Sequence, residues 1–125
     1  MSAEQVVRDF LAAWPRRNIE ELMSFFAPDA VYHNVPVAPL RGAPAIRAAF
    51  EGFLIAMPEI CLDVVSLAGR GDVVHTERID RFQLPSGERF DLPVAGIFEL
   101  RAGKIVRFSD YFDLASFEGP SGLKL

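Results

Sequence analysis

The sequence is poor in the residues from which metal sites and nucleophilic enzyme sites are commonly built. Its one cysteine, Cys61, excludes an intramolecular disulfide and a cysteine-based metal cluster. It has two histidines, His33 and His75, and no spacing typical of metal ligands or of a Ser–His–Asp or Cys–His arrangement. We therefore expect no bound metal, and carboxylates remain as the candidate reactive groups.

Long apolar runs and excess positive charge are also missing. No run of about eighteen apolar residues occurs, so we expect no membrane span. The N-terminal residues MSAEQVVRDF show no basic region followed by an apolar run, so we expect no signal peptide and a cytoplasmic protein. The formal net charge of −4 argues against a nucleic acid partner.

What the sequence does contain is a large supply of apolar side chains. Half of the 125 residues are hydrophobic, and eleven are Phe. A chain of this length typically forms one domain and can bury a core without disulfides or metals. We therefore treat residues 1–125 as a single domain, with enough apolar side chains to line a pocket as well as to fill a core.

Three helices are predicted in the first half of the chain. Ser2 is suited to cap a helix whose apolar side comprises Val6, Val7, Phe10, Leu11 and Trp14. Asn18 is suited to cap a second, short helix. The third helix is predicted over residues 43–56 and ends at Pro58.

The rest of the chain predicts strands. The segment APDAVYHNV suggests a turn followed by a strand, and a loop rich in Pro and Gly comes next. Four further strands are expected at residues 60–68, 73–84, 89–100 and 104–112, with turns between them. Helices followed by a meander indicate an α+β domain with a mostly antiparallel sheet. If that sheet is strongly curved, with Gly96 as a possible bend point, it forms a cone-shaped pocket under the helices.

Alternation of side chains along each strand assigns residues to the two faces of the sheet. In the strand 73–84 the inward positions are Val74, Thr76, Arg78, Asp80 and Phe82. In the strand 104–112 they are Val106, Phe108, Asp110 and Phe112. The odd positions of this last strand, Ile105 and Ser109 among them, are expected to face solvent or a partner.

Three charged residues thus fall on an inward face. Because a buried carboxylate is costly unless it is paired, we expect Arg78 to bridge Asp80 and Asp110 across the sheet. Like charge and desolvation would raise the pKa of one carboxyl, while Arg78 favours ionisation of the other. Such a pair suits acid–base catalysis, and a purely structural ion-pair network is the alternative.

Two uncharged polar residues share a face of the earlier strand. Tyr32 and Asn34 have the same parity, so together they could orient a water molecule. Each could also be an ordinary polar residue with satisfied hydrogen bonds. His33 has the opposite parity and is expected to be exposed, and His75 lies on the outward parity of its own strand.

Three segments, VYHNVPVAP, HTERIDRF and AGIFELRAGKIVRFSDYFDLASFE, resemble the limonene-1,2-epoxide hydrolase family in sequence and in spacing. The resemblance covers residues 6–117. It implies the cone-shaped α+β fold of the nuclear-transport-factor-like, or SnoaL-like, class, which ketosteroid isomerases and polyketide cyclases share. It also implies a cofactor-free hydrolase that adds water to a small apolar epoxide, and a homodimer.

The resemblance assigns roles residue by residue. It places the bridging arginine at Arg78, the general acid at Asp80, the general base at Asp110, and the water-positioning pair at Tyr32 and Asn34. The substrate-binding lining that it implies is Leu11, Trp14, Phe53, Met57, Leu62, Phe82, Leu92, Val94, Phe112 and Phe117. The sequence departs from the family at Ser109, Phe108 and Trp14, which affects pocket shape.

Two other functions remain open on the same residues. One is an isomerase or cyclase that uses an Asp base on a carbon acid, and the other is a non-catalytic module that binds an apolar ligand. For assembly, Ile79 and Ile97 have the outward parity of their strands. Because exposed apolar patches commonly mark interfaces, we expect a homodimer formed through the sheet.

Overall fold

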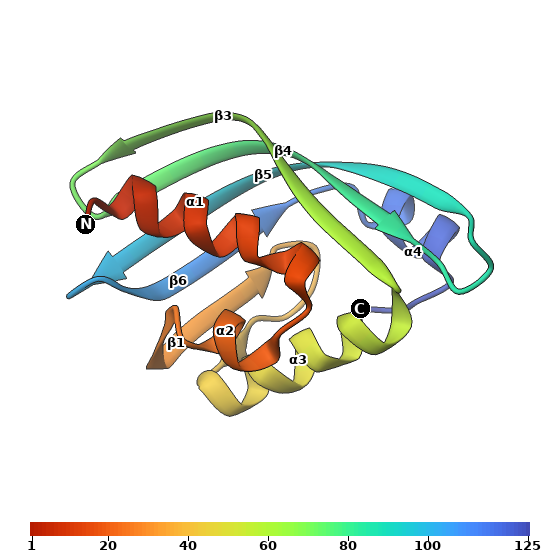
Figure 1. The fold of residues 1–125 in the computed structure, drawn as a ribbon, viewed down its shortest axis with the longest axis horizontal. Coiled ribbons are helices and arrows are strands. Elements are labelled where there is room, and N and C mark those ends of the chain that lie inside the picture. The colour runs from red at the N-terminus through yellow and green to blue at the C-terminus, as the bar shows by residue number, and fades with distance from the viewer.

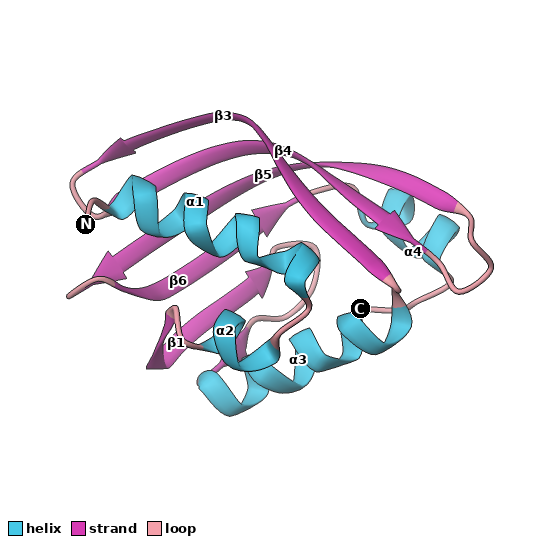
Figure 2. Cartoon of the chain, in the orientation of Figure 1, coloured by secondary structure: helices cyan, strands magenta, loops and turns pink.

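The computed structural model describes residues 1–125. Its helices are α1 (Ala3–Ala13), the 3₁₀ helix η1 (Trp14–Arg16), α2 (Ile19–Met23), α3 (Ala43–Ala56) and α4 (Leu114–Ser121). Its strands are β1 (Phe26–Asn34), β2 (Leu40–Arg41), β3 (Glu59–Arg70), β4 (Val73–Gln83), β5 (Arg89–Arg101) and β6 (Lys104–Tyr111). Figure 2 shows the helices gathered against one curved sheet.

The six strands form one mixed sheet in the order β2-β1-β6-β5-β4-β3. Every neighbouring pair is antiparallel except β1 and β6, which run parallel. The sheet curves around α1, which packs on β3 (Figure 1). Helix α3 packs on β1, and α4 lies near the end at which β5 begins. The predicted fold class, a curved and mostly antiparallel sheet with three N-terminal helices, is confirmed.

The helix ends follow the local chemistry of the sequence. The Ser2 hydroxyl accepts a hydrogen bond from the Gln5 backbone N–H at 3.1 Å, and the Asn18 side chain accepts one from Glu21 at 3.1 Å. After η1, the guanidinium of Arg17 donates to the carbonyl oxygen of Met57 at 2.9 Å. Arg17 thus ties the first helical segment to the C-terminal end of α3.

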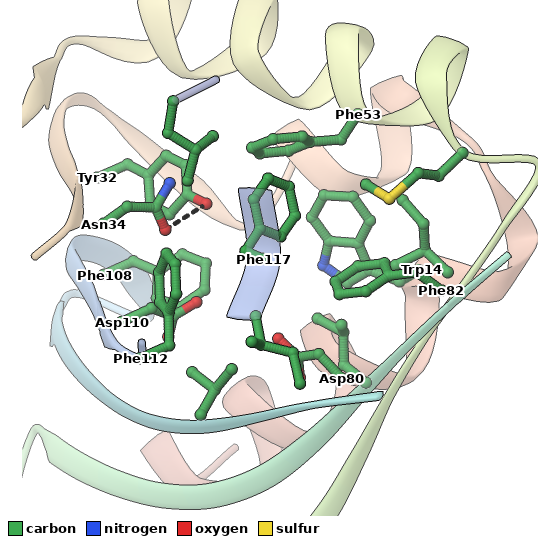
Figure 3. Close-up of a pocket in the computed structure, with 16 residues that line it drawn as sticks. Trp14, Tyr32, Asn34, Phe53, Asp80, Phe82, Phe108, Asp110, Phe112 and Phe117 are labelled. Carbon is green, nitrogen blue, oxygen red and sulfur yellow. Dashed lines mark hydrogen bonds between the residues drawn. The ribbon is translucent and has the colours of Figure 1, made fainter. Parts of the chain in front are cut away.

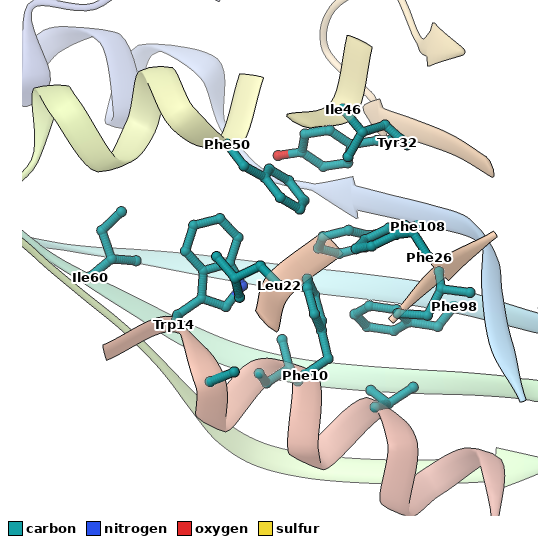
Figure 4. Packing of buried hydrophobic residues seen from close by; sticks show 14 of the residues in the cluster. Phe10, Trp14, Leu22, Phe26, Tyr32, Ile46, Phe50, Ile60, Phe98 and Phe108 are labelled. Atoms are coloured by element: carbon teal, nitrogen blue, oxygen red, sulfur yellow. The ribbon is translucent and has the colours of Figure 1, made fainter. Parts of the chain in front are cut away.

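The hydrophobic core lies between α1, α3 and the sheet. Its centre is Phe10, whose ring contacts five other phenylalanines and Trp14, mostly edge to face (Figure 4). Edge-to-face packing is a favourable arrangement for aromatic rings. The pocket lies next to this aromatic cluster, since Trp14, Tyr32 and Phe108 belong to the core and also line the pocket.

The structure differs from the sequence expectations in two elements. The short strand β2 occupies the loop after β1, and the additional helix α4 follows β6. Asp113 caps α4 by accepting a hydrogen bond from the Ser116 N–H at 3.0 Å. No helix combines the length and apolar character that crossing a membrane requires.

A register shift corrects the predicted faces of β6. Between Glu99 and Leu100 the pairing with β6 shifts by one residue, so Ile105 pairs with Leu100 and is fully buried. Val106, expected inward, is only half-buried. Ser109 is buried despite its outward parity, and its hydroxyl accepts a hydrogen bond from Arg107. A bulge changes the parity of every residue on one side of it, and alternation alone does not reveal its position.

Candidate active site

Strands β4 and β6 place three charged side chains inside the cone. Arg78 and Asp80 lie on the inward face of β4, and Asp110 lies on the inward face of β6, two residues after Phe108. The Arg78 side chain is sealed from solvent, whereas each carboxylate keeps 8% of its side-chain surface exposed. The predicted inward positions of these three residues agree with the structure.

The guanidinium of Arg78 bridges the two carboxylates. It donates to Asp80 through Nε (3.0 Å) and Nη2 (2.9 Å), and to Asp110 through Nη1 (3.0 Å) and Nη2 (2.9 Å). The remaining contact of Nη1 is to the hydroxyl of Thr76 at 3.3 Å. All five N–H groups of the guanidinium therefore have an acceptor, which fixes its plane and both carboxylates.

One row of paired residues crosses the sheet at this point. Thr76 on β4 pairs with Gly96 on β5, Gly96 pairs with Asp110 on β6, and Asp110 pairs with Asn34 on β1. The Thr76 hydroxyl also donates to the Gly96 carbonyl at 3.3 Å, which orients its lone pairs toward Arg78. The space above Gly96, where other residues carry a Cβ, is filled by the guanidinium.

Burial dominates the electrostatics of the charged group. It raises the pKa of Asp80 to about 6, against the opposing charge of Arg78. It also raises the pKa of Asp110, which Arg78 again opposes. Although burial has the reverse effect on Arg78, the two carboxylates raise its pKa, so it stays protonated. One cation balances one carboxylate, and the pair is therefore suited to sharing a proton.

Tyr32 and Asn34 lie together beside Asp110. The Tyr32 hydroxyl donates to Asn34 Oδ1 at 3.0 Å, and the Tyr32 ring stacks on Phe108. Burial, together with the charge of Asp110, raises the pKa of Tyr32 well above its usual range, so its hydroxyl stays protonated. The two side chains thus form a polar edge next to one carboxylate and away from the other.

These polar groups open into an apolar pocket of about 500 Å³, its open mouth included. Figure 3 shows Asp80 and Asp110 on its wall, with Tyr32 and Asn34 at one side and Trp14 and Phe53 opposite. Arg78 lies behind the carboxylates and is not part of the lining. The predicted lining residues that the structure places on the pocket are Trp14, Phe53, Met57, Leu62, Phe82, Leu92, Val94, Phe112 and Phe117.

Leu11 is a correction to the predicted lining. It is 1% exposed and belongs to the hydrophobic core, and it does not line the pocket. The structure adds Ile60, Phe108 and Leu125 to the lining. The indole N–H of Trp14, in the pocket wall, has no acceptor within the chain.

Sequence reasoning also missed Thr76 and the site role of Gly96. Both positions follow from strand register: Thr76 shares its inward face with Arg78, and Gly96 pairs with Asp110. As expected, His75 is exposed, whereas His33 is half-buried and contacts the Val37 carbonyl, outside the pocket. No three His, Cys, Asp or Glu side chains are grouped as metal ligands.

The fold and the site together define a cone-shaped α+β domain with an apolar pocket and two carboxylates on its wall. The family model of the SnoaL-like domain matches residues 7–108. The chain therefore belongs to the SnoaL-like domain family.

Solved structures with the same fold include proteins of several kinds. An LEH-like epoxide hydrolase from M. tuberculosis is 26% identical, with a TM-score of 0.82 over 94% of this chain and 87% of that one. A candidate polyketide cyclase from Xanthomonas campestris is 18% identical, with a TM-score of 0.85 over 95% and 96% of the two chains. A Catenulispora acidiphila protein with a ketosteroid isomerase-like fold, in complex with trimethylamine, is 24% identical, with a TM-score of 0.82 over 95% and 93%.

Proposed function

We propose that this protein is an epoxide hydrolase that adds water in one step to a small, apolar epoxide and releases a vicinal diol. The observation that carries the proposal is the contact of one buried guanidinium with two carboxylates that both face an apolar pocket. An epoxide needs a proton on its oxygen and a base on the attacking water, and this pair offers both. The similarity to an LEH-like epoxide hydrolase adds support.

The roles of the two carboxylates follow from their neighbours. Asp110 is the base, because Asn34 pairs with it across the sheet and Tyr32 lies beside Asn34. These three side chains hold a water that Asp110 deprotonates. Asp80 lies on the other side of the guanidinium and protonates the epoxide oxygen as the C–O bond breaks. Water attacks opposite the leaving oxygen, so a cyclic epoxide gives a trans diol.

Arg78 keeps the pair ready for this reaction. It orients both carboxylates and balances one negative charge, while burial keeps a proton on the other carboxyl. Each acid or base typically contributes about 10²–10⁴-fold to the rate. Placing water and epoxide at fixed positions supplies a further part of the acceleration. The reaction needs no cofactor.

A second candidate function is isomerisation or cyclisation of a carbon acid, as in other enzymes of this fold class. The neutral Tyr32 hydroxyl beside Asp110 favours it, because such chemistry needs a base and a hydrogen-bond donor for the enolate. It gives no role to Asp80 or to the bridging guanidinium. Epoxide hydrolysis is the better proposal because it gives a role to Asp80 and Arg78 as well as to Asp110.

Turnover of a cyclic epoxide such as limonene-1,2-epoxide tests the proposal, with proton exchange at a ketosteroid as the competing assay. Asp110→Asn and Asp80→Asn should each abolish or nearly abolish diol formation. Asp91→Asn is the matched control, since Asp91 is half-exposed on β5 and pairs only with Arg81 on the outer face. Proton exchange that depends on Asp110 without diol formation would establish the second candidate instead.

A further inference from the structure

A second hollow lies beside the pocket, on the other side of Tyr32 and Asn34. We call it the side groove. Four of its lining residues, Tyr32, Asn34, Phe53 and Leu125, also line the pocket. The other four are Val37, Ala38, Leu40 and Ala49. The pocket and the side groove are therefore adjacent, and the polar edge of the candidate site forms part of both.

The lining of the side groove suits a hydrocarbon. Asn34 is the one lining residue with a side-chain amide, and the oxygen of that amide already accepts a hydrogen bond from the Tyr32 hydroxyl. No charged side chain lines it, and its empty volume is about 560 Å³, mouth included. A groove of this kind gains affinity from buried apolar surface and offers little to an ion or a polar group.

Leu125 lies where the two hollows meet. It lines both, and the residue is 36% exposed. Its backbone N–H donates to Glu118 on α4 at 2.9 Å, and Lys124 approaches the same carboxylate at 3.5 Å. Leu125 is thus part of the wall that the two hollows share, together with Tyr32, Asn34 and Phe53.

We propose that the side groove binds the apolar chain of a substrate whose epoxide lies in the pocket. This inference rests on the proposed function and names its substrate class: epoxides that carry a linear hydrocarbon chain. A chain attached to the reacting carbon beside Asp110 passes Asn34 and Leu125 and enters the side groove. The continuity of the two linings at the reacting end of the pocket assigns the groove to the same ligand.

The test is the dependence of kcat/KM on chain length across 1,2-epoxyalkanes. Burial of one CH₂ is worth about fourfold in kcat/KM, from roughly 0.8 kcal/mol per group. For the unmodified protein, we expect kcat/KM to rise by about this factor with each CH₂ that enters the groove.

Two variants should change this dependence in opposite directions. Ala38→Phe fills the groove from an exposed position that does not line the pocket, so it should remove the gain with chain length and leave short epoxides unchanged. Leu125→Ala removes side-chain volume from the wall that the two hollows share and should favour long chains. Pro36→Phe, exposed in the same segment, and Lys124→Ala are the controls, since neither residue lines either hollow.

Equal kcat/KM for short and long chains, or an Ala38→Phe variant that slows all epoxides alike, would overturn the inference. Dissociation of a dimer by Ala38→Phe would also overturn the inference, because a second copy of the chain would then occupy the groove. If no epoxide of any length is hydrolysed, the proposed function fails, but the groove is still testable. Binding of long-chain alkanols, followed by fluorescence of the single Trp14 in the pocket wall, should then weaken in Ala38→Phe. Unchanged binding would overturn the groove assignment.

Discussion

Gly96 lies directly against the guanidinium of Arg78. A Cβ at position 96 would stand 2.4 Å from Nη1 of Arg78, closer than any two such atoms can approach. It would also lie 2.7 Å from Oδ1 of Asp110 and 2.9 Å from the Thr76 hydroxyl. The guanidinium is held by five hydrogen bonds, so it cannot move aside without losing some of them.

Gly96→Ala should therefore displace the bridge and lower kcat/KM by about 10²-fold or more, since misplacement of about 1 Å can have that effect. Gly52→Ala is the matched control, because a Cβ at position 52 would meet nothing within 4 Å beyond its chain neighbours and the backbone of its own helix. Diol formation by both purified variants measures the difference. Full activity of Gly96→Ala would mean that the bridge is not required.

The Thr76 hydroxyl accepts a hydrogen bond from the fifth N–H of Arg78. The contribution of this hydrogen bond should be measurable as a change in the free energy of unfolding. Thr76→Val keeps the shape of the side chain but leaves one buried N–H of a charged group without an acceptor. We expect a loss of about 1–3 kcal/mol in the free energy of unfolding, measured by urea denaturation. Thr76→Ser keeps the hydroxyl and should retain most of the stability. Equal losses in the two variants would point to packing instead.

The faces of the long strands could be predicted from the sequence because one physical rule, alternation, governs them. Arg78, Asp80 and the apolar positions of β5 follow it without interruption. The bounds of α3 followed from an apolar helical pattern ended by a proline, and they agree with the structure. The strands and helix that position the candidate site could therefore be predicted from their regular hydrophobic patterns.

The features of the structure that the sequence did not predict depend on contacts between residues far apart in the chain. The bulge opposite Leu100 exchanges the faces of Ile105 and Val106, and no local pattern marks it. Helix α4 is short and contains Pro120, so its sequence has a weak helical pattern. The importance of Gly96 arises only when Arg78 and Asp110 reach it from neighbouring strands, and the sequence alone indicates no more than a bend point there.

Stability should depend on the protonation of Asp80. Burial raises its pKa to about 6 in the folded protein, whereas the unfolded chain has the ordinary value of about 3.9. The folded state thus keeps a proton that the unfolded state releases. The free energy of unfolding should therefore fall as pH rises from about 4 through about 6. Full stabilisation is present below about pH 4.

Urea denaturation across this pH range tests the linkage, with Asp80→Asn as the comparison. The amide releases no proton, so the stability of the unmodified protein should decline relative to the variant as pH rises. Parallel pH profiles would show that Asp80 has an ordinary pKa in the folded state.

We propose that two copies associate through the outer face of the sheet. Ile97 is half-buried on β5, and Tyr111 on the neighbouring β6 is 44% exposed. Light scattering should give about twice the 13.9 kDa of one chain at micromolar concentration. Ile97→Glu should shift the protein to monomer, whereas Ile55→Glu, on an 85% exposed position of α3, should not. A monomeric unmodified protein would contradict the proposal.

The last prediction concerns which atom attacks the epoxide. A carboxylate can attack carbon itself and form an ester, or it can deprotonate a water that attacks. The ester route needs a second base, commonly histidine, to activate the hydrolytic water. Neither histidine lines the pocket, whereas Tyr32 and Asn34 stand beside Asp110 and can hold a water there. Direct attack by water is therefore expected.

A single turnover in oxygen-18 water, with enzyme in excess over the epoxide, separates the two routes. Direct attack puts the label into the diol in the first turnover, because the new C–O bond is made by water. Asp110→Asn should form no diol yet remain folded, since the amide cannot accept the proton from that water. The ester route would instead give a first diol that carries ordinary oxygen, with the label accumulating in the carboxylate of Asp110. Mass spectrometry of the diol and of the peptide containing Asp110 measures both products, and label in that peptide would establish the covalent route.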